Sequence, residues 1–168
     1  IAAIGIAYQM HGLVALDAQG EVLRPSIIWC DSRAVTIGEK AFQAIGEQYC
    51  LEHYLNTPGN FTASKLRWIR ENEPDIFKKI DKIMLPGDYI AYRMTGEICS
   101  TVTGLSEGVF WDFTTNGPAK KLLDYYEILE TMLPPVRGVF EQQGRLHTAA
   151  AVAPGLLAGI PVGYRAGH

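Results

Sequence analysis

The sequence predicts an α/β fold, and three observations lead to that prediction. Residues 1–7 form a near-continuous apolar run with Ala and Gly, as in a strand covered on both faces. Farther along, strand-like runs alternate with segments whose apolar residues recur at helical spacing. The chain has no repeat of fixed period and no low-complexity segment. Strands that alternate with helices are typical of α/β domains.

The first half of the chain is expected to contain a hairpin and then helices. Asp17-Ala18-Gln19-Gly20 is a turn signal between residues 13–17 and 21–24. Asp31 or Ser32 can cap the helix that follows, and Thr62 can cap a later one. Helices are expected at residues 34–55 with a break at Gly46, at 63–72 and at 74–80.

The second half is expected to alternate between strands and helices. Gly96 is expected to end the helix predicted at residues 87–96, because glycine is favoured at the end of a helix. Strands are expected at residues 82–86 and 108–113, helices at 87–96 and 120–129, and a strand, a helix and a strand within 144–167.

The composition excludes several classes of protein. With 168 residues, 48% of them hydrophobic and 20% charged, the chain has material for one core. A net charge of −3 gives no basic surface for nucleic acid. Three cysteines without a CxxC argue against a disulfide framework and suit a reducing, cytoplasmic compartment. No segment has the run of about 18 apolar residues that a membrane helix needs.

One motif favours a hydrolase. Residues 104–108, GLSEG, match G-x-S-x-G around Ser106, and Asp112 or Asp124 followed by His147 has the chain order of the catalytic triad. That motif requires an apolar strand before the serine and a helix after it. Here the preceding residues are polar and the following ones are strand-like, so a serine hydrolase is only a distant alternative.

The histidines do not predict a metal site. The four histidines lack a spacing such as HxxxH, and no carboxylate cluster accompanies them. His53 lies in a helical stretch and His147 near a helix start, where a surface or capping role is expected. We therefore expect no bound metal in this chain.

Gln9, Met10 and His11 follow directly after the opening strand. Ligands of α/β proteins bind in the crevice outside the carboxyl ends of the strands. An amide and an imidazole suit a polyhydroxy ligand, and the Met10 thioether can lie against its carbon skeleton. From the pattern alone, a ligand site and a purely structural strand end remain equally open.

Residues 5–34 resemble the FGGY family of carbohydrate kinases, and in particular the xylulokinases in it. The resemblance lies in Gln9-Met10-His11-Gly12 and in a following Trp-x-Asp-x-Arg pattern. A second family pattern is matched later in the chain. The matching residues are Trp29, Asp31 and Arg33 for the first pattern, and Lys65, Trp68, Ile69, Glu71 and Asn72 for the second.

Three later segments are also similar to the family and stand in its order, so the resemblance covers the whole chain. They are LPGDYIAYRMTGE from Leu85, FWDF from Phe110 and GLLAGIPVGYRAG from Gly155. The resemblance implies an incomplete domain of the actin-like, ribonuclease H-like ATPase fold, with a mixed sheet and flanking helices.

The resemblance also implies a sugar site. Met10 and His11 would touch the sugar, with Gln9 close behind. Asn60 departs from the family, whose members have an aromatic or small residue at that position facing the substrate, so it could change the sugar preference. For Asp31 and Arg33, a helix cap and its partner are expected rather than sugar contacts.

Family members join two such domains, with the sugar mainly on the first and ATP mainly on the second. By the resemblance, residues 1–168 are part of the sugar-side domain, and the first hairpin and the C-terminal nucleotide domain lie outside this chain. The start at Ile1, without a methionine, agrees with a piece of a longer protein. The family's general base is an aspartate at the position held here by His168, which either replaces the base or belongs to an added tag.

The expected activity is therefore that of the full-length parent. It would phosphorylate a ketopentose, with D-xylulose first, using ATP and Mg²⁺, neither of which is expected on this chain alone. Alternatives are an FGGY kinase for ribulose, fuculose, fructose or glycerol, and a non-catalytic sugar-binding module. The chain alone is expected to be inactive and to pair with itself as a homodimer through exposed sheet edges.

Overall fold

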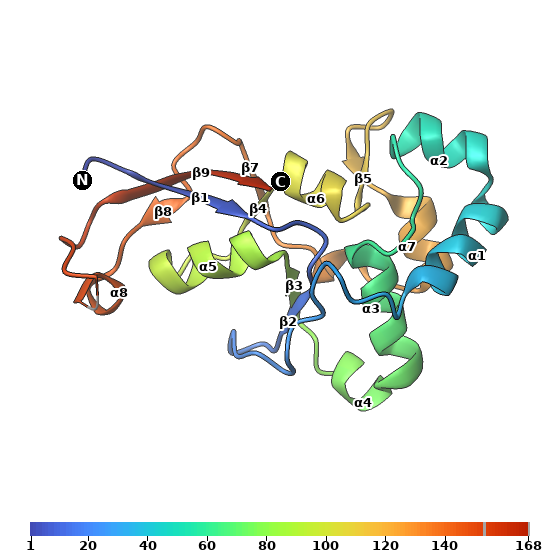
Figure 1. Cartoon of the computed structure of the whole chain (residues 1–168), viewed down its shortest axis with the longest axis horizontal. Helices are drawn as coiled ribbons and strands as arrows, with labels where there is room; N and C mark the ends of the chain where they lie inside the picture. Colours follow the sequence, from blue (N-terminus) through green and yellow to red (C-terminus); the bar gives the residue numbers. More distant parts are fainter. Residues whose placement is uncertain (153, 168) are drawn as a thin grey trace.

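Strands and helices alternate along the chain in the computed structural model, which describes residues 1–152 and 154–167. Figure 1 shows a sheet at the left, with a long helix running beside it, and a group of helices at the right. This mixed α/β architecture confirms the predicted fold class.

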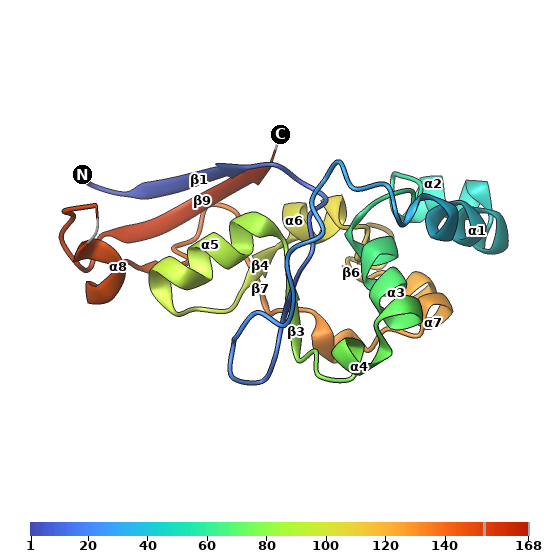
Figure 2. The ribbon, with the colours of Figure 1, turned by 60° about the horizontal axis from the view of Figure 1, so that its bottom comes forward.

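The three-stranded sheet carries both ends of the described chain. Its strands are ordered β1-β9-β8: β1 (Ile4–Tyr8) runs parallel to β9 (Pro161–Gly167), and β8 (Gly144–Arg145) is antiparallel to β9. Helix α5 (Pro86–Thr95) lies along this sheet in two views (Figures 1 and 2). A Cβ atom at Gly87 would lie 2.2 Å from the Tyr8 ring, so this glycine allows α5 to approach β1.

The prediction that the opening strand is covered on both faces is wrong. Along β1 the burial alternates, with Gly5 and Ala7 exposed and Ile4, Ile6 and Tyr8 partly buried. Helix α5 packs on one face, and only small side chains point to the other. A run of Ala, Gly and Ile looks the same in the sequence whether one face or both are covered, so the pattern could not separate the two cases.

The remaining strands form short pairs. The predicted hairpin is confirmed by the bridge between Leu16 and Val22 and by the bond from the Asp17 N–H to the Glu21 carbonyl, 3.0 Å long. The pairs are β2 (Val14–Leu16) antiparallel to β3 (Lys82–Met84), β4 (Ser100–Thr101) parallel to β7 (Val136–Arg137), and β5 (Trp111–Asp112) antiparallel to β6 (Gly117–Pro118).

The helices at the right of Figure 1 enclose the main core, to which the fully buried Leu66 and Ile69 belong. These helices and the other short ones are α1 (Val35–Ile45), α2 (Glu47–His53), α3 (Thr62–Asn72), α4 (Pro74–Phe77), α6 (Val102–Glu107), α7 (Lys120–Tyr126), α8 (Thr148–Val152) and a 3₁₀ turn, Glu130–Met132. Within the described part, no helix has the length and apolar character that crossing a membrane requires.

Two predicted helix caps are wrong. Helix α1 begins after Ala34 without a side-chain cap, because the Asp31 carboxylate accepts hydrogen bonds from Arg33 instead. Helix α3 begins after Phe61, and the buried Thr62 hydroxyl donates to the Gly12 carbonyl at 3.3 Å. In both cases the side chain that could have capped the helix forms a hydrogen bond with another partner, either a near neighbour or a residue distant in the sequence.

Helix α6 covers residues for which no helix was predicted, and it removes the basis for a hydrolase. Thr101 caps α6 by accepting the Gly104 N–H at 3.1 Å, and Ser106 lies within the helix rather than on a strand-to-helix turn. Asp112 bonds to His53 at 2.9 Å. The Nδ1 atom of His147 accepts the Ala150 N–H at 3.1 Å, which confirms the capping role expected for this histidine.

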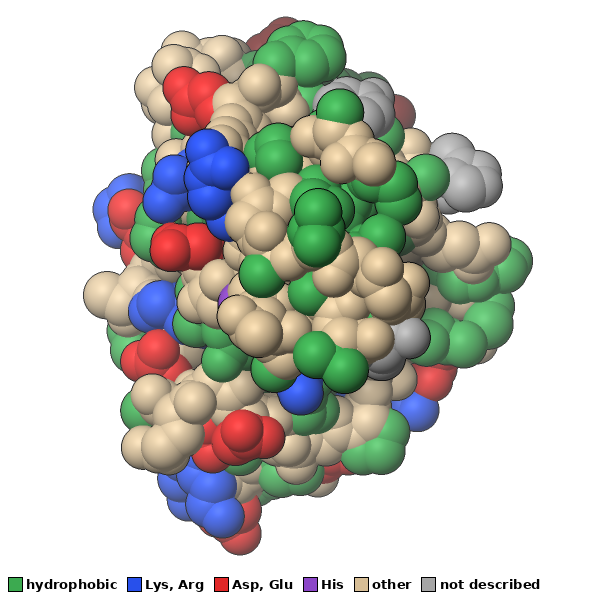
Figure 3. All heavy atoms as spheres, turned by 90° about the vertical axis from the view of Figure 1, so that its left-hand side faces the viewer, with side chains coloured by type: hydrophobic (Ala, Val, Ile, Leu, Met, Phe, Trp, Pro, Cys, Tyr) green, Lys and Arg blue, Asp and Glu red, His purple; other side chains and the backbone are tan. Residues whose placement is uncertain are grey.

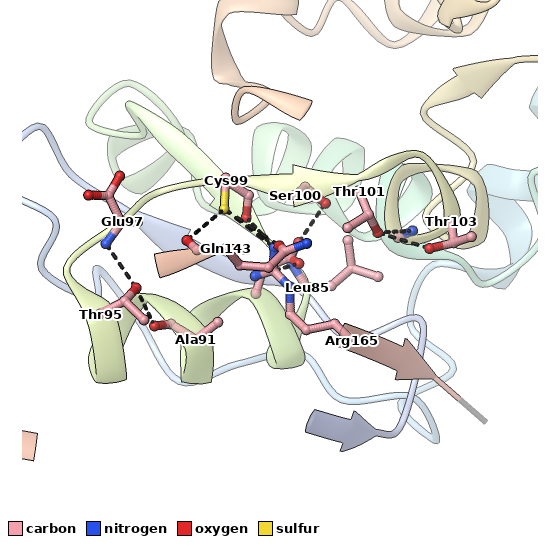
Figure 4. A network of polar contacts seen from close by, with 12 residues as sticks. Leu85, Ala91, Thr95, Glu97, Cys99, Ser100, Thr101, Thr103, Gln143 and Arg165 are labelled. Atoms are coloured by element: carbon pink, nitrogen blue, oxygen red, sulfur yellow. Dashed lines mark hydrogen bonds and ion pairs between the residues drawn. The ribbon is translucent and has the colours of Figure 1, made fainter. Parts of the chain in front are cut away.

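A buried polar network joins α5 to β4, to β9 and to Gln143, which directly precedes β8 (Figure 4). Asp88 accepts a hydrogen bond from the Ser100 hydroxyl at 2.8 Å and lies 3.2 Å from the Arg165 guanidinium. The other Arg165 nitrogen donates to the Cys99 carbonyl at 3.2 Å and to the Gln143 amide oxygen. Burial raises the pKa of Asp88, and the Arg165 charge opposes that rise. The network ties β9 to its neighbours close to the end of the strand.

Apolar side chains are exposed on the side of the molecule where the three-stranded sheet ends. Figure 3 shows this face, the left side of Figure 1, with hydrophobic side chains spread over much of it and most of the charged ones toward its left and lower edges. Ile1, Val152 and Leu157 are 82%, 73% and 81% exposed.

Candidate functional site

Two small cavities open where the chain leaves β1. One, of about 220 Å³, is lined by Gln9, Met10, His11 and Trp29. The other, of about 270 Å³, is lined by Gln9, Ile28, Trp29 and Pro86, so the two share a wall. They lie at the carboxyl end of a parallel strand pair, where α/β sheets bind ligands.

Met10 lies against the end of β9. Tyr8 pairs with Gly167 in the parallel ladder, and a Cβ atom at Gly167 would lie 1.9 Å from Met10 Cγ. Glycine at this position therefore leaves the space that the Met10 side chain fills. Gln9 is exposed at the mouth of both cavities.

His11 is held in one orientation by groups distant in the sequence. Its Nδ1 lies 3.0 Å from the Glu107 carbonyl oxygen, and its ring packs edge-on against Phe61 with centroids 4.4 Å apart. Because a carbonyl oxygen only accepts, Nδ1 carries the proton that it donates, and in the neutral ring Nε2 is left as an acceptor. His11 also has a φ of 62°, a left-handed backbone conformation that residues other than glycine rarely adopt.

Lys65 of α3 lies behind the cavities and is fully buried. Its Nζ donates to the carbonyl of His11 at 2.8 Å and to that of Ile28 at 2.9 Å. Burial lowers the pKa of Lys65 to about 8, and the nearby Asp31 carboxylate opposes that shift. In the sequence, Lys65 stands in the second family pattern, and no role was predicted for it.

Asn60 does not line either cavity as the described residues form them. Its side-chain N–H donates to the Asp31 carbonyl at 2.7 Å, and its Oδ1 is buried without a hydrogen-bond partner among the described residues. Asn60 thus holds the segment that follows Trp29 in place, and through this backbone contact it can influence the position of the cavity wall.

Asp31 and Arg33 pair with each other, as expected. The Arg33 guanidinium donates to both Asp31 oxygens, at 2.9 and 2.6 Å, and these hydrogen bonds lower the pKa of Asp31. The same guanidinium lies 4.5 Å above the Trp68 ring. The pair braces the loop after Trp29 against α3.

Trp29 was named in the sequence only as part of a pattern and was not predicted as a site residue. It lines both cavities and is 53% exposed. An exposed tryptophan offers a flat apolar face with a polar N–H. Its position two residues before Asp31 in the Trp-x-Asp-x-Arg pattern was the available signal.

His53 belongs to a separate cluster, contrary to the surface or capping role expected for it. Its Nδ1 donates to Asp112 at 2.9 Å, and the Tyr49 ring stacks on it with centroids 3.7 Å apart. Although burial opposes ionisation, hydrogen bonds from Thr114 and His53 lower the pKa of Asp112. Across the described residues, three or more His, Cys, Asp or Glu side chains nowhere gather as metal ligands would. His168 lies outside the described residues.

A family comparison decides what class of protein carries this site. The family model described as "FGGY family of carbohydrate kinases, N-terminal domain" matches residues 1–167. The chain belongs to the FGGY family. It is 36% identical over 162 residues to the xylulose kinase of Escherichia coli K12, which covers 96% of this chain and 33% of that protein. The xylulose kinase of Bacillus subtilis 168 is 32% identical over 160 residues, covering 91% of this chain and 31% of that protein. This FGGY chain thus spans about a third of the length of the curated relatives that it matches.

Solved structures of sugar kinases share the fold of this chain. A "xyloylose kinase" from Brucella ovis has a TM-score of 0.87 and 32% identity, and the match covers 99% of this chain and 34% of that one. The xylulose kinase of Rhodospirillum rubrum has a TM-score of 0.89 and 28% identity, with the same coverage. These neighbours are sugar kinases of the actin-like ATPase fold, which confirms the fold that the resemblance implied.

Proposed function

We propose that the full-length protein containing this FGGY chain transfers a phosphoryl group from ATP to a ketopentose, with D-xylulose as the preferred substrate. The observation that carries the proposal is the cavity formed by Gln9, Met10, His11 and Trp29 at the end of β1. The xylulose kinases among the relatives of this chain support D-xylulose as the first sugar to test.

The four side chains suit a small polyhydroxy ligand. In neutral His11, Nε2 can accept a hydrogen bond from a sugar hydroxyl, because Nδ1 is engaged by the Glu107 carbonyl. Gln9 offers one acceptor and two donors. Met10 and Trp29 offer apolar surfaces for the C–H faces of the sugar. Asn60 would influence the sugar preference through the Asp31 backbone.

The remaining parts of the reaction lie outside the described residues. We place the general base, an aspartate in the family, at the position after Gly167, which His168 holds in this sequence. ATP and Mg²⁺ would bind mainly on a second domain of the full-length protein, in keeping with the match of this chain to the N-terminal domain of the family. The 168-residue chain would then be inactive alone, and it would form a homodimer through the edge of β1. We place the protein in the cytoplasm, in keeping with its free cysteines.

A sugar-dependent ATP consumption assay on the full-length protein tests the proposal. The substrates are D-xylulose, D-ribulose, L-xylulose, D-fructose, L-fuculose and glycerol. We expect the highest kcat/KM for D-xylulose. His11→Ala should lower it by about 100-fold, because the sugar hydroxyl loses its partner. Ser106→Ala, which changes a residue within α6, is the matched control and should retain activity.

Each other result contradicts a different part of the proposal. A higher kcat/KM for another substrate would keep a carbohydrate kinase and reject D-xylulose. Binding of a sugar without ATP consumption would favour a non-catalytic sugar-binding module. Full activity of His11→Ala would remove His11 from the sugar site.

A further inference from the structure

We infer that Lys65 is a positioning residue that holds the two backbone segments of the sugar cavity in register by donating a hydrogen bond to one carbonyl in each. The inference rests on the proposed function for the identity of the ligand. The two hydrogen bonds of Lys65 that support it lie within this chain and do not depend on that function.

The two carbonyls come from the two walls of the cavities. His11, whose carbonyl oxygen lies 2.8 Å from Lys65 Nζ, lines the smaller cavity. Ile28, whose carbonyl oxygen lies 2.9 Å from the same atom, lines the larger one. Trp29 follows Ile28 directly and lines both. One ammonium group therefore connects the segment that carries His11 with the segment that carries Trp29.

Lys65 has an unusual environment for a lysine. It is fully buried, and among the described residues none of the ion pairs includes it. The side chains that act on its charge are Asp31 and Cys30, which favour the ammonium form, and Arg33, which disfavours it. Burying an ammonium group without a carboxylate is costly, so a purely structural core position would favour an apolar side chain of similar length.

The bond to His11 accounts for the strained backbone there. His11 has φ of 62°, so its carbonyl points toward Lys65 while its ring remains against Phe61 and the Glu107 carbonyl. Left-handed residues other than glycine persist only where surrounding contacts hold them. Without the Lys65 donor, the peptide after His11 can rotate, and the backbone that carries the imidazole is no longer fixed on that side.

Kinetics of Lys65→Met in the full-length protein test the inference. Methionine has nearly the length of lysine but no N–H donor. We expect the KM for the sugar to rise about tenfold, as for the loss of two hydrogen bonds that position the site, while the KM for ATP and kcat change less than about twofold. Lys82→Met is the matched control, since Lys82 donates to the Thr131 carbonyl at 2.6 Å and lines neither cavity. A merely structural role would lower Tm and the active fraction without changing the KM for the sugar.

Hydrogen–deuterium exchange separates this inference from the proposed function. In Lys65→Met, exchange should increase in residues 9–12 and 26–30 together, and not in residues 86–95. If the wild-type protein phosphorylates no sugar but this joint increase is seen, the proposed function fails and the positioning role stands. Unchanged exchange and an unchanged KM for the sugar would overturn the role of Lys65. If Lys65→Met does not fold, Lys65→Gln takes its place. The Gln amide ends one atom short of the Nζ position, so we expect it to lose at least one of the two hydrogen bonds, with the same joint increase in exchange; unchanged exchange and an unchanged KM for the sugar would again overturn the role.

Discussion

Arg165 and Asp88 form an ion pair in the interior, with each side chain 1% exposed and Nη1 3.2 Å from Oδ1. We expect Asp88→Asn to lower the free energy of unfolding by about 3–5 kcal/mol, because it leaves the Arg165 guanidinium buried without a counter-charge. Urea unfolding measures the change. Asp124→Asn removes a carboxylate that pairs with Lys120 at the surface, 66% and 75% exposed, and should cost less than about 1 kcal/mol. A similar small loss in Asp88→Asn would contradict the prediction.

Gly167→Ala should displace Met10 from its position beside the cavity. The new Cβ atom would lie 1.9 Å from Met10 Cγ, so the side chain must move, at a stability cost of about 1–3 kcal/mol and with a higher KM for the sugar. The double variant with Met10→Ala should recover part of the lost stability. Gly163→Ala, in the same strand, introduces a Cβ atom that meets nothing within 4 Å and serves as the control. Equal effects of the two alanines would show that the contact with Met10 is not responsible.

Asn60→Ala should change sugar preference more than stability. It removes the hydrogen bond to the Asp31 carbonyl and frees the segment after Trp29, so we expect the ratio of kcat/KM for D-xylulose to that for D-ribulose to change by about tenfold. Asn56→Ala is the control, because Asn56 accepts the Thr57 N–H within the same loop region. Parallel losses for both sugars would assign Asn60 a general structural role.

Lys65 should make stability depend on pH in the alkaline range. Its pKa is about 8 in the folded protein against 10.5 in the unfolded chain, so between these values the unfolded state binds more protons. Stability from this group is therefore lowest below pH 8 and rises as the pH approaches 10.5. The difference in unfolding free energy between the wild type and Lys65→Met, measured by urea unfolding from pH 7 to 10, should shift in favour of the wild type. A constant difference would mean that Lys65 titrates normally.

Much of the fold could be predicted because its longer elements follow apolar periodicity. Helices α1, α3 and α5 and the hairpin after β2 lie within or close to their predicted ranges. Helix α6 was missed because its six residues, which include Gly104, are too few to show a helical periodicity of apolar residues. The helix starts at the Thr101 cap instead. The exposed face of β1 was missed because Ala and Gly suit either environment.

The candidate site was predicted in part. The strand end pointed to Gln9, Met10 and His11, and the structure brings these three to one cavity, although their contact with sugar stays a prediction. The sequence could not indicate how Lys65 and Glu107 act on His11, because both contacts involve backbone carbonyls and residues far apart in the chain. Such contacts depend on the tertiary fold and leave no local pattern.

The approach of α5 to β1 couples two distant positions during evolution. The Tyr8 ring occupies the space where a side chain at position 87 would begin, 2.2 Å from a Cβ atom placed there. A larger residue at 87 is therefore tolerated only after the aromatic ring at 8 has been lost. Replacement at 8 can come first, whereas replacement at 87 cannot. Divergence of this helix and strand is thus expected to proceed in a fixed order of substitutions.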